Sequence, residues 1–127
     1  KLETYRYISH LDWVRLMQRA FKRAGIPVAY TQGFNPKPKM HFSPALPMFM
    51  AAAAEWLDVD VTANCTLPDV VASVNRYLPP ACALTGGQAI PLISPSIDAS
   101  ILSMTYTASL TPNVTEACQS EPSRGVQ

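Results

Sequence analysis

The sequence has few residues of the kinds that hold metals, form disulfides or cross membranes. Its three cysteines, Cys65, Cys82 and Cys118, are 17 and 36 residues apart, which matches neither the close pairs of a zinc site nor a disulfide framework. The longest strongly apolar run, residues 45–54, is interrupted by Pro47 and is much shorter than the roughly 20 residues that cross a bilayer. We therefore expect buried thiols in a reducing cytoplasm, no bound metal and no membrane segment.

Motifs for catalysis are equally scarce. A Gly-rich phosphate loop, a nucleophile elbow and a metal-binding cluster are all missing. The two histidines are His10 and His41, and residues 41–43 are similar to half of the paired His-x-Ser/Thr motif that supplies acid and base in some phosphodiesterases. The second copy is missing, because Leu11 and Asp12 follow His10. A phosphodiesterase is thus our weakest alternative, and we expect no enzymatic activity from this chain alone.

The composition is that of one folded domain. Of 127 residues, 48% are hydrophobic and 15% are charged, so the chain can bury enough apolar surface for a single core. It opens on Lys1 and lacks the apolar stretch of a secretory signal, which favours a domain taken from a longer protein. We expect the domain over residues 1–110 and a disordered tail over residues 111–127, which are polar and without apolar periodicity.

Charge is divided along the chain, although the net charge is only +1. Up to Phe42 there are eight basic and two acidic residues, whereas the remainder has two basic and seven acidic residues. This asymmetry predicts a face for anionic ligands, such as phosphate, nucleic acid or an acidic protein surface. The alternative is an ordinary solvated helix face.

The pattern after residue 8 predicts an amphipathic helix from near Leu11 to near Ala24. Ser9 is typical of an N-cap, and Gly25 provides a residue that tolerates the positive φ of a helix end. With 3.6 residues per turn, the apolar side chains fall on one arc. Another arc carries bases: Arg15, Arg19, Lys22 and Arg23.

Extended segments and a second helix follow from alternation and from turn residues. The predicted strands lie at residues 2–8, 28–32, 40–43, 55–62 and 82–92, and the second helix lies between residue 67 and the break at Pro79. We interpret the order as β-α-β-β-α-β, an α+β ferredoxin-like split β-α-β sandwich with an antiparallel sheet and two helices on one face. A short helical turn that starts at residues 95–96 and an extra C-terminal strand at residues 103–110 complete this prediction.

Two places in the sequence are candidates for binding an anionic partner. His10 and Asp12 lie at the predicted helix start, where free backbone amides favour anions; alternatively, Asp12 caps the helix and His10 packs at its edge. The loop of residues 32–39 contains two prolines and interleaves aromatic and basic side chains, which suits stacking on nucleobases. It could equally be a rigid turn with lysines for solubility. The predicted binding residues are His10, Asp12, Arg15, Arg19, Gln32, Phe34, Asn35, Lys37 and Lys39.

Three segments carry a resemblance to a known family. Residues 6–12, 18–24 and 27–39, with the core Gly-Phe-Asn-Pro-x-Pro-Lys at residues 33–39, resemble the bacterial radical SAM-linked protein family, and the likeness extends over residues 1–110. Members occur fused behind radical SAM proteins or encoded beside them, and some are neighbours of ribonuclease E/G genes. The sequence departs from the family where Lys37 replaces a frequent histidine, and in residues 48–54, which replace a stretch that commonly contains Gly and acidic or Ser residues.

The resemblance implies an accessory, non-catalytic role in a radical SAM system. The chain has no Cys-x3-Cys-x2-Cys motif, so the iron–sulfur cluster and S-adenosylmethionine are expected in a radical SAM partner and no cofactor is expected in this chain. Our preferred hypothesis is recognition of an RNA or RNA-associated substrate, with Arg15, Arg19, Lys37 and Lys39 on phosphates and with Phe34 and Asn35 giving specificity. The alternative is a protein–protein docking module that contacts the partner through residues 46–54.

Overall fold

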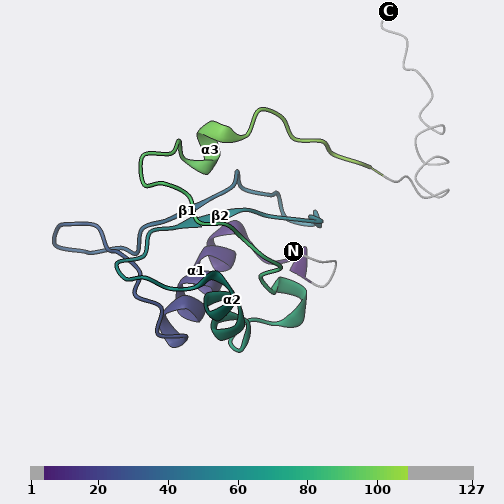
Figure 1. Cartoon of the computed structure of the whole chain (residues 1–127). Helices are drawn as coiled ribbons and strands as arrows, with labels where there is room; N and C mark the ends of the chain where they lie inside the picture. Colours follow the sequence, from purple (N-terminus) through teal and green to yellow (C-terminus); the bar gives the residue numbers. More distant parts are fainter. Residues whose placement is uncertain (1–4, 109–127) are drawn as a thin grey trace, which may run out of the picture.

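The computed structural model describes residues 5–108, which form a two-stranded antiparallel sheet with helices on both of its faces (Figure 1). Helices α1 and α2 cover one face, and the short helix α3 lies over the other. In chain order the elements are α1 (His10–Arg23), β1 (Met40–Phe42), β2 (Leu57–Val59), α2 (Leu67–Asn75), the 3-10 turn η2 (Pro80–Cys82) and α3 (Ile97–Ser100). The predicted mixed α and β class is confirmed.

Local signals fix helix α1. The Ser9 hydroxyl accepts a hydrogen bond from the Asp12 amide at 3.2 Å and donates to the Asp12 carboxylate at 2.7 Å, so two groups of the first turn are satisfied. At the other end, Gly25 has a φ of 69°, which a residue with a Cβ rarely adopts. The helix therefore begins and ends within one or two residues of the predicted positions.

The core lies between α1, α2 and the sheet. Helix α1 buries Trp13, Met17, Ala20 and Phe21 at helical spacing, and Val74 of α2 packs into the same cluster. From the sheet, the alternate residues Met40, Phe42, Leu57 and Val59 pack against this cluster. Since side chains alternate across a strand, His41 and Asp58 belong to the opposite face. There the Asp58 carboxylate accepts the Ile97 amide at 3.1 Å, which attaches α3 to that face.

The predicted strands are present only in part. Residues 40–43 and 55–62 contain β1 and β2, which pair in the register Met40–Val59 and Phe42–Leu57. Residues 28–32 do not form a strand of the sheet, and their only β-pairing within residues 5–108 is through two isolated bridges, Val28 with Val61 and Tyr30 with Pro38.

Three predicted strands do not form within the described residues. Residues 5–8 form turns, with the Ile8 amide 3.4 Å from the Tyr5 carbonyl. Residues 82–92 form no strand. At Leu84 the Asn75 side chain takes the place of a strand partner: its Nδ2 donates to the carbonyl at 2.9 Å and its Oδ1 accepts from the amide at 2.7 Å. Residues 103–108 are likewise not a strand.

With two strands in residues 5–108, the ferredoxin-like arrangement that we predicted is not confirmed. The short helical turn expected at residues 95–96 is present as α3. The predicted tail at residues 111–127 lies outside the described residues. No helix in residues 5–108 is long and apolar enough to span a membrane.

Candidate nucleic-acid interface

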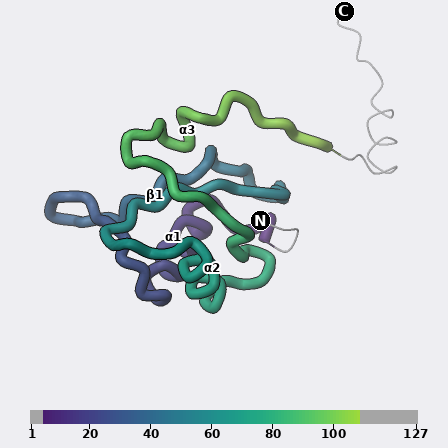
Figure 2. Tube along the Cα trace, viewed as in Figure 1, coloured from purple at the N-terminus to yellow at the C-terminus, as the bar shows by residue number. Residues whose placement is uncertain are grey.

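The loop that the sequence singles out is the end of a hairpin. Its stem pairs residues 29–31 with residues 37–39: Thr31 donates its amide to the Lys37 carbonyl at 2.8 Å, Lys37 returns its amide to the Thr31 hydroxyl at 2.9 Å, and Lys39 donates to the Ala29 carbonyl at 2.8 Å. The hairpin projects from the body of the fold between α1 and β1 (Figures 1 and 2).

The base of this hairpin is fastened to the sheet. Ala29 donates its amide to the Asp60 carbonyl at 2.8 Å, and the Asp60 amide donates to the Lys39 carbonyl at 3.1 Å. Lys39 also donates its amide to the Ala29 carbonyl, so Ala29, Lys39 and Asp60 are joined by a closed ring of three backbone hydrogen bonds. This ring fixes where the hairpin leaves the sheet and therefore how it faces α1.

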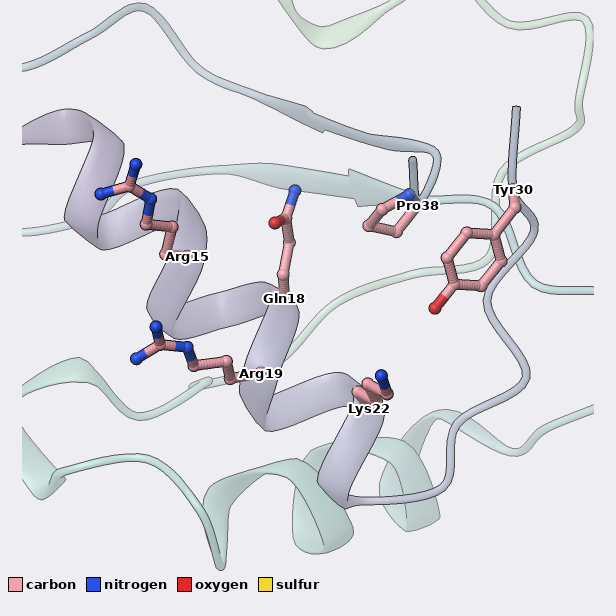
Figure 3. Close-up of a pocket in the computed structure, with 6 residues that line it drawn as sticks. All are labelled: Arg15, Gln18, Arg19, Lys22, Tyr30 and Pro38. Carbon is pink, nitrogen blue, oxygen red and sulfur yellow. The ribbon is translucent and has the colours of Figure 1, made fainter. Parts of the chain in front are cut away.

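Between α1 and the hairpin stem lies an open pocket of about 260 Å³. Helix α1 contributes four residues at positions i, i+3, i+4 and i+7, which lie on one face of a helix, and the bridged pair of the stem completes the lining. The lining residues are Arg15, Gln18, Arg19, Lys22, Tyr30 and Pro38. Figure 3 shows the Tyr30 hydroxyl turned toward α1. We call this set the cationic pocket.

Charge in the cationic pocket is poorly compensated. Arg15 lies 3.4 Å from the Asp12 carboxylate, and both side chains are more than half exposed, so this contact neutralises Arg15 only partly. Arg19 and Lys22 form no ion pair with any other described residue. No acidic residue lines the pocket. Three cations with one partial counter-charge favour an anionic ligand.

The structure separates the predicted site residues into three groups. Arg15 and Arg19 line the cationic pocket. Lys37 and Lys39 are exposed and flank Pro38 in the stem, so alternation directs them to the side of the hairpin away from the pocket. At the tip are the exposed residues Gln32, Phe34 and Asn35, of which Phe34 is fully exposed.

The two predicted residues at the start of α1 do not line the pocket. The His10 ring packs edge-on against Phe42, with a distance of 6.1 Å between ring centroids. Asp12 is engaged with Ser9 and Arg15. Both positions correspond to the capping alternative that the sequence left open.

The placement of the histidines is unfavourable for a phosphodiesterase. His10 packs on the Phe42 side of β1, whereas His41 is exposed and precedes Phe42 in the strand, so its side chain leaves the opposite face. An acid and a base for one phosphate must reach the same atoms. The two imidazoles lie on opposite faces of β1 and are thus poorly placed to act as such a pair.

Four lining residues were not among those predicted to bind: Gln18, Lys22, Tyr30 and Pro38. The helical spacing of Gln18 and Lys22 from Arg15 and Arg19 was a signal that could have identified them. Tyr30 and Pro38 enter through their pairing in the stem, for which the sequence has no comparably local signal.

Residues 46–54, the predicted docking stretch, form a second exposed feature. Met48 and Phe49 are exposed, and the Phe49 ring meets Tyr7 edge-on at 5.8 Å between centroids. Phe49 has a φ of 69°, an uncommon conformation for a residue with a bulky side chain. Its amide donates to the Arg6 carbonyl at 2.8 Å, which holds the turn.

Residues 5–108 contain no group of three or more His, Cys, Asp or Glu side chains able to hold a metal ion. Of the cysteines in this part of the chain, Cys82 is buried as expected, whereas Cys65 is exposed. An iron–sulfur cluster does not fit the residues described.

Comparison with known proteins identifies a family. The model of a family described as "uncharacterized protein conserved in bacteria" (DUF2344) matches residues 1–125. The curated proteins contain no match to the chain, and the solved structures contain none either.

Proposed function

As the chain belongs to this family of bacterial proteins, we propose a function from its own residues: it recognises RNA by binding the phosphate backbone in the cationic pocket. The observation that carries the proposal is that Arg15, Arg19 and Lys22 line one pocket without an acidic residue. Phosphate is the anion that such a set binds best, because guanidinium groups donate paired hydrogen bonds to its oxygens.

RNA is favoured over a small phosphate ester by the surroundings of the pocket. Exposed lysines on the hairpin, Lys37 and Lys39, extend the positive charge beyond the pocket, and Phe34 and Asn35 at the tip offer base contacts. Backbone contacts position a nucleic acid, and base contacts give specificity. A pocket beside a projecting hairpin provides both kinds.

The radical SAM partner is part of the same proposal. The resemblance at residues 6–12, 18–24 and 27–39 supports it. The partner would hold the iron–sulfur cluster and S-adenosylmethionine and perform the chemistry. This chain would bind the substrate and present it.

Titration of fluorescently labelled tRNA or ribosomal RNA fragments at low salt tests RNA binding. We expect the double variant Arg19→Gln/Lys22→Gln to bind about a hundredfold more weakly, because each of the two lost phosphate contacts costs about tenfold near 50 mM salt. The matched control is Arg23→Gln/Arg76→Gln, which removes the same charge from two exposed residues outside the pocket and should change affinity much less. No binding by the wild-type protein, or equal loss in the two double variants, would contradict the proposal.

A second candidate function is docking onto the radical SAM partner through protein contacts alone. The strained and exposed Phe49, held edge-on by Tyr7, favours it, because aromatic side chains of this kind are frequent at interface centres. Co-purification with the partner that survives charge reversal at Arg15 and Arg19 but is lost in Phe49→Ala would support this candidate. The opposite pattern would favour binding through the cationic pocket.

A further inference from the structure

Phe34, the most exposed aromatic side chain of the hairpin, is not part of the hydrophobic core formed by residues 5–108. Phe34 is fully exposed, so its ring gains no packing energy from the described part of the chain. It follows Gly33, whose φ of 132° is strained for any residue with a side chain. The tip therefore has a turn that depends on a glycine and a large apolar ring in water.

The stem keeps that ring in a defined place. The reciprocal bonds of Thr31 and Lys37, and the Tyr30–Pro38 bridge, close the tip, and Pro36 restricts it further. A ring presented in this way loses little conformational entropy when a ligand covers it. The hairpin is thus better suited to stacking than a mobile loop would be.

The position of the ring relative to the cationic pocket limits what can cover it. Tyr30 and Pro38 line the pocket. Phe34 is four residues from each of them, so its Cα lies within about 14 Å of the Cα of either residue. A strand with its phosphates in the pocket passes the tip within a few nucleotides. In a duplex both faces of each base are covered by neighbouring bases, whereas an unpaired nucleotide offers a free face.

We propose that the ligand of this surface is single-stranded RNA, in which one unpaired base stacks on Phe34 while a nearby phosphate occupies the cationic pocket. This inference rests on the proposed RNA binding and narrows it from RNA in general to an unpaired segment. Any base can supply the π-face, so the stacking itself requires no particular sequence.

The test compares a short single-stranded oligopyrimidine RNA with the same RNA annealed to its complement, by fluorescence anisotropy. For the wild-type protein we expect the single strand to bind more tightly than the duplex. Phe34→Leu keeps an apolar side chain but removes the ring, and should weaken single-strand binding at least about fivefold while leaving duplex binding unchanged. Phe34→Trp should bind the single strand at least as tightly as the wild type does, and the emission of the new indole should be quenched on binding. Because Phe34 is exposed, none of these changes should alter folding.

Two results have separate meanings. If Phe34→Leu binds the single strand as tightly as the wild type, or if the duplex binds equally well, the stacking inference is overturned; a continued loss in Arg19→Gln/Lys22→Gln would then leave the proposed phosphate binding intact. If neither RNA binds, the proposed function fails and the inference fails with it.

Discussion

The salt dependence of RNA binding is the sharpest quantitative consequence of the cationic pocket. Each phosphate contact in a single strand contributes about −0.7 to the slope of log affinity against log salt. The three pocket cations, Arg15, Arg19 and Lys22, therefore give a slope of about −2.1. Between 50 and 200 mM salt the affinity should fall about twentyfold.

Removal of two of these cations changes the slope by a calculable amount. Arg19→Gln/Lys22→Gln leaves one contact, so the slope should become about −0.7 and the fall in affinity over the same range about threefold. Lys37→Gln/Lys39→Gln should reduce the slope less, because these side chains lie on the other side of the stem from the pocket.

Anisotropy titrations at four or more salt concentrations measure these slopes. Arg23→Gln/Arg76→Gln should retain the wild-type slope, because neither residue lines the pocket. A wild-type slope near zero, or a slope that Arg23→Gln/Arg76→Gln lowers as much as Arg19→Gln/Lys22→Gln does, would refute the assignment of phosphate binding to the pocket.

Three further predictions concern the scaffold of the site. Met17→Ala should lower the free energy of unfolding by about 2–5 kcal/mol in denaturant titrations, because Met17 is only 2% exposed and its truncation leaves a cavity in the core. Asn75→Ala should cost about 1–3 kcal/mol, since it removes both bonds to the half-buried Leu84 backbone; a cost near zero would show that water replaces them. Gly33→Ala, which puts a Cβ on a backbone with a φ of 132°, should weaken single-strand RNA binding in anisotropy titrations; Gly86→Ala, at a glycine without a positive φ and with nothing within 4 Å of the added Cβ, should not.

The first helix could be predicted closely because its determinants are local. The Ser9 cap, the Gly25 end and the apolar spacing of Trp13, Met17 and Phe21 all lie within or next to the helix. Its basic face followed from the same periodicity, so Arg15 and Arg19 were identified as candidate ligands before their surroundings were known.

The sheet was predicted less well because pairing is decided by residues far apart in the sequence. Residues 82–92 have the composition of a strand, but a helix side chain, Asn75, satisfies the Leu84 backbone. Residues 28–32 also look like a strand, yet only two of them form bridges, one on each side. Neither outcome is encoded by the local apolar pattern.

The pocket shows how these two kinds of information combine. Its α1 half depends on helical spacing, which the sequence contains. Its other half, Tyr30 and Pro38, depends on the register of the stem and on the hydrogen-bonded ring of Ala29, Lys39 and Asp60. This ring fixes the position of the stem beside α1. The second half therefore required the structure.

The basic stripe of α1 is separable from the stability of the fold, and this makes the binding variants interpretable. Like charges at the i,i+4 and i,i+3 spacings of Arg15, Arg19 and Lys22 cost a helix about 0.2–0.5 kcal/mol per pair, whereas Lys22 in the last turn gains about 0.3–1 kcal/mol from the helix dipole. The buried side chains Trp13, Met17 and Phe21 on the other face contribute about 1.5–3 kcal/mol each, so burial decides whether the helix forms.

The free energy of unfolding of Arg19→Gln/Lys22→Gln in urea should accordingly lie within about 1 kcal/mol of the wild-type value. A larger loss of stability would mean that the stripe is structural and that weaker RNA binding by this variant reports unfolding instead of a missing phosphate contact.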